Sequence, residues 1–356
     1  MNKGDFMNKI QLDNKALKPE IRSFHLIKAI CALGIIANHF SCYITNRAFL
    51  PLYTFANGSW GCVLVTIFFM VSGGLLYYNY SDKISVSTYY KKRWKAIFPM
   101  FYIAYFYFEL GNMFTYKSFL FRGSLFPYVF TLLGMDGYLS GTVTTYYILG
   151  EWFLGAIILL YISFPLVLYF FKKNSEIVFA ISLILYFVFL ERPIINPQPF
   201  WSITSCFVSF VVGMIIIKYR EFLTNRWSAL VSLLCFTCLL LIEIPVSQDV
   251  CNHFTGLFLF VFLIFAGEKI MLNTVFNKIF TKIGKLSYAI FLLQHITIVK
   301  VLGAFNPSSP IKILILLFLT MLLIIVEALV LSLFTKYVLV KSEHIFCTIK
   351  SRFAKT

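Results

Sequence analysis

The sequence predicts an all-α polytopic membrane protein, a bundle of about ten transmembrane helices. Three observations support this fold class: an apolar composition, apolar runs of helix length along nearly the whole chain, and basic residues in alternate gaps between those runs. Of the 356 residues, 60% are hydrophobic and only 13% are charged, and the mean hydropathy is +0.82. Soluble domains are about half apolar and about a quarter charged. The composition therefore excludes an ordinary soluble globular protein.

The apolar runs are long enough to cross a bilayer as helices, which takes about 17–25 residues each. Length and charge gaps divide them into ten expected spans, of which the fifth and the eighth are short. These spans are Phe24–Ile44, Trp60–Tyr80, Ile97–Tyr116, Ile148–Phe171, Ile177–Leu190, Phe200–Ile217, Trp227–Ile244, Phe254–Gly267, Leu286–Leu302 and Ile311–Thr335. We therefore expect a cytoplasmic N-terminal segment at 1–23, a membrane domain at 24–335 and a basic cytoplasmic tail at 336–356. The first segment is polar and does not resemble a cleavable signal.

The net charge of +16 is concentrated in alternate gaps between the expected spans. The intervening gaps hold only Arg47, Lys117, Arg122 and Arg192. By the positive-inside rule, the basic gaps and both termini lie in the cytoplasm, which requires an even number of spans. This distribution indicates orientation in a membrane rather than a surface for nucleic acid. We expect a multi-pass protein of the plasma membrane, with membrane lipid and no nucleic acid among its partners.

The first span is interrupted by Lys28 and His39. On an α-helix, eleven residues correspond to about 16 Å along the axis and about 20° around it, so the two side chains share one stripe. Polar and charged side chains are costly in hydrocarbon and face a polar interior. The alternative for His39 is a hydrogen-bonded packing residue, but the aligned Lys28 favours a functional role.

Two further stretches have both a structural and a functional interpretation. The small residues Ser72–Gly74 in the second span allow close helix packing, or they make room for a slender ligand chain. The aromatic and basic run Tyr89–Met100 contains Arg93 and Lys95. It sets the orientation of the protein, or it holds a phosphorylated cofactor through charge-assisted hydrogen bonds and ring stacking.

The cysteines do not predict a metal site. Cys235 and Cys238 have the spacing of a redox or metal motif, but no partner ligand lies near them in sequence, so packing is favoured. Cys42, Cys62 and Cys251 are expected near the outer face, where the question of disulfide pairing stays open. We therefore expect no bound metal.

Five stretches follow one another in a specific order. They are the Lys28–His39 stretch, FFMVSGGLL at 68–76, KRWKAIFPMFY at 92–102, EWFLGA at 151–156 followed by Tyr161 and FPL at 164–166, and GKLSYAIFLLQH at 284–295. Together they resemble the acyltransferase-3 family of integral membrane acyltransferases. The resemblance extends over roughly Phe24 to Phe334, essentially the whole membrane domain.

The resemblance implies a ten-helix bundle similar to the O-acetyltransferases of surface polysaccharides. Such a protein takes an acyl group, usually acetyl, from cytoplasmic acyl-CoA and transfers it to a hydroxyl of a surface polysaccharide or its lipid-linked precursor. The family's Arg-x10-His motif corresponds to Lys28 and His39, and its Arg-x-Arg motif corresponds to Arg93 and Lys95. Both lysines keep the positive charge but lose the bidentate fork of arginine.

Roles for individual residues follow from this resemblance. We expect His39 to act as general base, with Glu151 orienting it or the acceptor. The alternative for Glu151 is an exposed interfacial carboxylate, but the family pattern favours the functional role. The expected cofactor-binding residues, which hold acyl-CoA (acetyl-CoA), are Lys28, Ser72, Arg93 and Lys95. The expected substrate-binding residues are Tyr146, Trp152 and His295.

The longest outer gap and two polar residues late in the chain are harder to assign. The stretch Asp136–Tyr147 is expected to be loop-like, and its tyrosines either cover an acceptor sugar or form an interfacial aromatic belt. Glu109 is expected at mid-depth in the third span. His295 and Glu327 are polar groups inside spans, and each can instead form a structural hydrogen bond.

A transporter or flippase for a lipid-linked sugar is the alternative function, because it would share the polytopic bundle and the polar interior. Transporters often contain two related halves with interrupted helices. The second half of this chain contains no repeat of the Lys28–His39 stretch or of the Ser-Gly-Gly run. The sequence therefore favours the acyltransferase.

Overall fold

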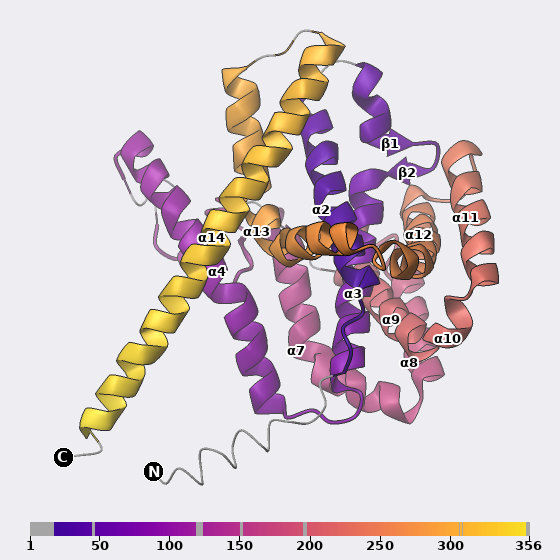
Figure 1. The fold of residues 1–356 in the computed structure, drawn as a ribbon, viewed down its shortest axis with the longest axis horizontal. Coiled ribbons are helices and arrows are strands. Elements are labelled where there is room, and N and C mark those ends of the chain that lie inside the picture. Colours follow the sequence, from indigo (N-terminus) through magenta and orange to yellow (C-terminus); the bar gives the residue numbers. More distant parts are fainter. Residues whose placement is uncertain are drawn as a thin grey trace.

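The computed structural model describes residues 18–44, 47–118, 124–149, 152–194, 198–305, 307 and 309–353. These residues form a helical bundle with a small two-stranded antiparallel hairpin. In Figure 1, α2 and α3 run through the middle, α4 and α14 lie on one flank, and α8, α10 and α11 lie on the other.

Each of the ten expected spans coincides with a helix. The long helices are α2 (Ser23–Cys42), α3 (Trp60–Tyr80), α4 (Val86–Tyr116), α7 (Trp152–Lys173), α8 (Ser175–Val188), α9 (Ile203–Lys218), α11 (Arg226–Leu241), α12 (Gln248–Ile270), α13 (Thr274–Ala304) and α14 (Pro310–Phe353). The short elements are η1 (Arg47–Leu52), β1 (Thr54–Phe55), β2 (Gly58–Ser59), α5 (Tyr128–Leu132), α6 (Asp136–Leu139), η2 (Pro199–Trp201) and α10 (Arg220–Leu223).

Among the helices of the described ranges, α2, α3, α7, α12, α13 and α14 up to His344 are long and apolar enough to cross a membrane. The apolar helices α8, α9 and α11 have 14, 16 and 16 residues. At 1.5 Å per residue, such helices are about 21–24 Å long, shorter than a hydrocarbon core of about 30 Å. The protein is therefore a multi-pass membrane protein, and the number of ten spans stays a prediction.

Polar residues in the sequence explain where several helices begin. A side-chain oxygen that accepts backbone N–H groups satisfies the unpaired donors of the first helical turn. Residues of this kind precede α3, α8, α11, α12 and α13; they are Ser59, Asn174, Asn225, Ser247 and Asn273. The matching bounds of the second expected span and of α3 show how closely such local signals fix a helix start.

Three elements differ from the sequence expectation. α4 begins at Val86, so the basic run is helical rather than part of a gap. Asp136–Leu139 form helix α6 instead of a loop. The Asp136 carboxylate lies in the first turn, where a negative charge interacts favourably with the positive end of the helix dipole. The last helix continues as far as Phe353, so most of the expected tail extends α14.

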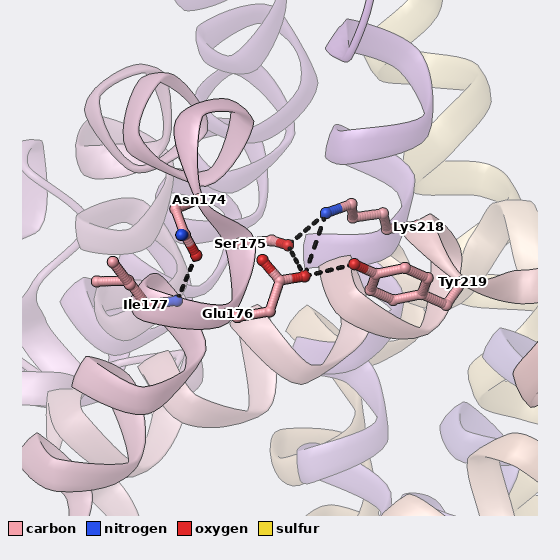
Figure 2. A network of polar contacts seen from close by, with 6 residues as sticks. All are labelled: Asn174, Ser175, Glu176, Ile177, Lys218 and Tyr219. Carbon is pink, nitrogen blue, oxygen red and sulfur yellow. Dashed lines mark hydrogen bonds and ion pairs between the residues drawn. The ribbon is translucent and has the colours of Figure 1, made fainter.

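A network of polar contacts lies at one end of the bundle, where α2 begins and where α3, α7, α9 and α12 end. We call this end of the bundle the basic end. Glu268 accepts hydrogen bonds from Ser23 at 2.8 Å and from Arg220 at 2.9 Å, which ties α12 to α2 and α10. Figure 2 shows the second part of the network, in which Lys218 donates to Ser175, and Tyr219 donates to Glu176. These contacts fix the start of α8 against the end of α9.

Helices α3 and α9 approach each other backbone to backbone. A Cβ added to Gly73 would lie 2.0 Å from the carbonyl oxygen of Phe210, and one added to Gly213 would lie 1.9 Å from that of Met70. The packing interpretation of the small residues in the second span is thus confirmed at Gly73. The expected role of the neighbouring Ser72 stays a prediction.

A hydrogen bond joins α13 to α14 beside the centre of the bundle. Thr297 Oγ1 donates to Glu327 Oε2 at 2.6 Å, so Glu327 has the structural role that the sequence left open. Interhelical hydrogen bonds inside membranes contribute about 0.6 kcal/mol on average and about 1.7 kcal/mol at most. We expect Thr297→Val to lower the free energy of unfolding by this amount, measured by denaturant titration in mixed micelles.

The matched control for this substitution is Thr320→Val. Thr320 is also buried, but its hydroxyl donates to Leu316 within α14 and not to another helix. Its loss should cost less, because the backbone carbonyl that it contacts belongs to the same helix. An equal loss of unfolding free energy in the two variants would show that the hydrogen bond between α13 and α14 contributes no more to stability than one within α14.

Candidate active site

Two histidines meet where α2 packs against α13. The rings of His39 and His295 stack with their centroids 4.0 Å apart and an angle of 27° between the planes. A glycine on α13 permits this close packing nearer the basic end: a Cβ added to Gly284 would lie 2.4 Å from the carbonyl oxygen of His25. The sequence thus brings the two helices close enough for the histidines to touch.

The stacked histidines are suited to accepting a proton. Nδ1 of His39 is buried and has no hydrogen-bond partner in the described part of the chain. Two positive charges about 4 Å apart repel each other, so the pair favours at least one neutral ring. A neutral imidazole with a buried, unpaired nitrogen can accept a hydrogen bond, and then a proton, from a hydroxyl group.

Lys28 lies on the same stripe of α2 as His39, three turns closer to the basic end. Its side chain is partly buried, and Glu20 and Lys285 are the charged groups that act on it. Glu20 is itself in contact with His25, whose Nε2 lies 2.5 Å from its Oε1. This hydrogen bond lowers the pKa of Glu20. Lys28 has no ion pair with any described residue, so its charge is available to an anion.

Arg93 lies between α4 and α7. Its guanidinium carbon is 5.6 Å from the centre of the Tyr161 ring, and its Nε is buried without a hydrogen-bond partner among the residues that the structure describes. Tyr89 donates to the Tyr161 carbonyl at 2.9 Å and so fixes α4 against α7 at this level. A mainly apolar cavity of about 380 Å³ borders Arg93. This arginine is a second cation available to an anion.

Lys95 points elsewhere. Its Nζ lies 2.6 Å from Oε1 of Glu343 on the extension of α14, and both side chains are exposed. Residues two positions apart on a helix are separated by about 200°, so Arg93 and Lys95 cannot face the same partner while α4 is helical. The structure therefore separates these two expected phosphate-binding residues. Ser72 on α3 is partly buried and forms no hydrogen bond with a described residue.

Aromatic side chains connect α7 to the histidine pair. The ring of Phe153 lies 4.7 Å from that of Phe69 on α3 and 5.2 Å from that of Phe291, which is one turn before His295 on α13. The preceding residue, Trp152, stacks on Trp201 at 5.3 Å with an angle of 12°. Trp152 also lies 6.2 Å from Phe69 between ring centroids, so it packs in the same aromatic cluster. Glu151, the expected orienting carboxylate, lies outside the described residues.

Tyr146 lies at the end of the bundle opposite to the basic end. Its ring stacks on Tyr128 at 4.1 Å, and its hydroxyl donates to the Ser124 carbonyl at 2.7 Å. Tyr128 in turn donates to Glu109 at 2.5 Å. Tyr146 also borders a cavity of about 570 Å³. Tyr146 thus packs against its neighbours, and its expected contact with the substrate stays a prediction.

The pairing of His39 with His295 is the main feature that the sequence did not predict. The sequence predicts a role for each residue, but it predicts that His295 contacts the substrate rather than the base. The available signal was that each histidine lies in the half of its span that is farther from the basic end. Among the residues in the described ranges, no group of three or more His, Cys, Asp or Glu side chains is arranged to hold a metal ion. Cys42, Cys62 and Cys251 are free thiols.

Comparison with known proteins assigns the family. A family model described as an acyltransferase domain, that of the acyltransferase-3 family, matches residues 21–331. No curated protein and no solved structure matches the chain. The matched region includes the stacked histidines, Lys28 and Arg93, together with the helices that position them. The chain therefore belongs to the acyltransferase-3 family and is a membrane acyltransferase.

Proposed function

We propose that the protein transfers an acyl group, most simply acetyl, from cytoplasmic acyl-CoA to a hydroxyl of a cell-surface polysaccharide or its lipid-linked precursor. The observation that carries this proposal is the stacked pair of His39 and His295, with the unpartnered Nδ1 of His39 on the same stripe as Lys28. In this proposal all ten long helices cross the plasma membrane. Both termini and the basic end face the cytoplasm.

The chemistry requires a base and two aligned reactants. The acceptor oxygen attacks the thioester carbonyl, the carbon–sulfur bond breaks, and a new ester bond forms. His39 takes the hydroxyl proton and then passes it to the departing thiolate of CoA, so no proton is left over. A general base of this kind contributes about 10²–10⁴-fold in rate, and alignment of the two reactants contributes more.

Two cations are proposed to bind the phosphates of the donor. Lys28 and Arg93 both lack ion pairs in the described chain, and each can bind a phosphate oxygen by a charge-assisted hydrogen bond. About 16 Å separate Lys28 from His39 along α2, and the slender arm that carries the acyl group is proposed to extend along this stripe. Lys95 can join the site only if it leaves Glu343.

The acceptor is proposed to arrive from the opposite end. Tyr146, which borders the cavity at that end, and Trp152 are proposed to contact the sugar, and His295 is proposed to hold the reacting hydroxyl against His39. Glu151 precedes Trp152 in the chain and is proposed to orient the base or the acceptor. This arrangement lets the two substrates meet at the histidines from opposite sides of the membrane.

An acyl-transfer assay tests this function. Purified protein in lipid nanodiscs is supplied with acetyl-CoA labelled in the acetyl group and with base-treated surface polysaccharide. We expect label in the polysaccharide as an ester that hydroxylamine removes, together with one free CoA thiol for each ester formed. Protein reconstituted in vesicles that moves the sugar across the bilayer and consumes no acetyl-CoA would be a transporter, and this result would reject the proposal.

A further inference from the structure

The cavity beside Tyr146 lies between the end of α4, the segment 146–148 and α13. Its volume of about 570 Å³ falls within the range of small-molecule binding sites, about 300–1,000 Å³. Polar groups of its lining include Asn112, Thr115, Tyr147 and Lys300. A cavity with amide, hydroxyl and aromatic groups suits a carbohydrate.

Lys300 is the charged member of this lining in the described part of the molecule. Its Nζ lies 5.6 Å from the centre of the Phe108 ring, which steadies the cation over an aromatic face. Glu109, the next residue on α4, points to Tyr128 and does not line the cavity. Lys300 has no ion pair with a described carboxylate. The cavity therefore presents a positive charge that its own lining does not neutralise.

The cavity and the proposed reaction centre both involve α13, on different faces of the helix. Ile296, the residue after His295, contributes to its wall. Lys300 follows His295 by five positions on α13, which places its Cα about 7.5 Å farther from the basic end and its side chain about 140° around the helix. A ligand held by Lys300 therefore reaches the histidine pair only if it extends around α13, as a chain of several sugars can.

We infer that the acceptor carries an anionic group, which Lys300 binds in this cavity at a distance from the hydroxyl to be acylated. This inference rests on the proposed function. A lysine ammonium is a compact charge that binds a sugar carboxylate or a phosphate oxygen equally well. Two sources therefore provide the same chemistry: an acidic sugar within the glycan, and the diphosphate of a lipid-linked precursor.

Lys300→Met tests the inference, because methionine keeps an unbranched apolar stem on Phe108 and removes the charge. The probes are a glucuronic-acid-containing tetrasaccharide, its neutral methyl ester, and a polyprenyl-diphosphate-linked N-acetylglucosamine. We expect the KM for an anionic probe to rise about tenfold, equal to about 1.4 kcal/mol, with kcat unchanged. The KM for the methyl ester should not move. A tenfold change limited to the acid tetrasaccharide identifies an acidic sugar, and one limited to the lipid-linked probe identifies the diphosphate.

Lys312→Met is the matched control, since Lys312 is an exposed lysine near the start of α14 that does not line the cavity. It should leave every KM unchanged. An unchanged KM for both anionic probes in Lys300→Met, or an equal effect of Lys312→Met, overturns the inference while acyl transfer still supports the proposed function. Absence of acyl transfer to all probes by the native protein rejects the proposed function instead. Thermal stabilisation by each anionic probe without acyl-CoA then tests Lys300 directly: equal stabilisation of native protein and Lys300→Met overturns the inference, and its loss supports it.

Discussion

His39→Gln should reduce kcat for acyl transfer by about 10²–10⁴-fold, the usual contribution of a general base. Glutamine keeps a polar side chain of similar length at the α2–α13 contact, but it cannot take up the hydroxyl proton. Binding of acyl-CoA should change little, because Lys28 and Arg93 remain. Rates of labelled acetyl transfer and equilibrium binding of CoA, measured on the same preparation in nanodiscs, separate the two effects.

His253→Gln is the matched control for this prediction. His253 is also a partly buried histidine, but it contacts Asp249 and Ser205 between α12 and α9 rather than His295. Its substitution should leave kcat within a few-fold of the native value. A folded His39→Gln protein that binds CoA and retains the native kcat would show that His39 is not the base.

The stacking of His39 on His295 adds a further expectation for the same experiment. Residues that act as one unit have non-additive effects when they are removed together. His295→Gln should therefore reduce kcat on its own, and the double variant should be little worse than His39→Gln. Fully multiplicative losses would mean that the two rings act independently in spite of their contact.

Gly213→Ala should have the largest effect on stability. The added Cβ would lie 1.9 Å from the carbonyl oxygen of Met70 and 2.6 Å from its carbonyl carbon and Cα. These are backbone atoms, so no side chain can rotate away and α3 must separate from α9. Overpacking a core costs about 1–3 kcal/mol where side chains can adjust, and we expect at least the upper figure here. The loss of stability is measured from the thermal unfolding midpoint and the monodispersity of the variant in detergent.

Gly303→Ala provides the comparison for this substitution. Gly303 also lies in a long helix, α13, but a Cβ added there meets nothing within 4 Å. Because glycine inside a helix is about 0.5–1 kcal/mol less favourable than alanine, Gly303→Ala should be neutral or stabilising. If Gly213→Ala proved as stable as Gly303→Ala, the result would contradict a close backbone contact between α3 and α9.

Local pattern was sufficient for the helices. A long run of apolar residues predicts a membrane helix whatever its tertiary contacts, and a Ser or Asn cap acts within three residues of itself. The expected span Trp60–Tyr80 therefore matches α3 at both ends. Pattern failed where helical order continued past the apolar run. α4 begins at Val86, and tyrosine hydroxyls on its first turns bond to carbonyls of α7, contacts that no local signal reveals.

The sequence by itself determined the membrane class, the apolar segments of the ten long helices and the family, and it placed His39 and Lys28 on one stripe of α2. Only the tertiary structure decided that His39 contacts His295, that Arg93 and Lys95 face different partners, and that Lys300 borders a cavity. The physical reason is that periodicity fixes directions around one helix axis. Contacts between side chains far apart in the chain depend instead on how closely the helices pack, which small residues such as Gly284 determine.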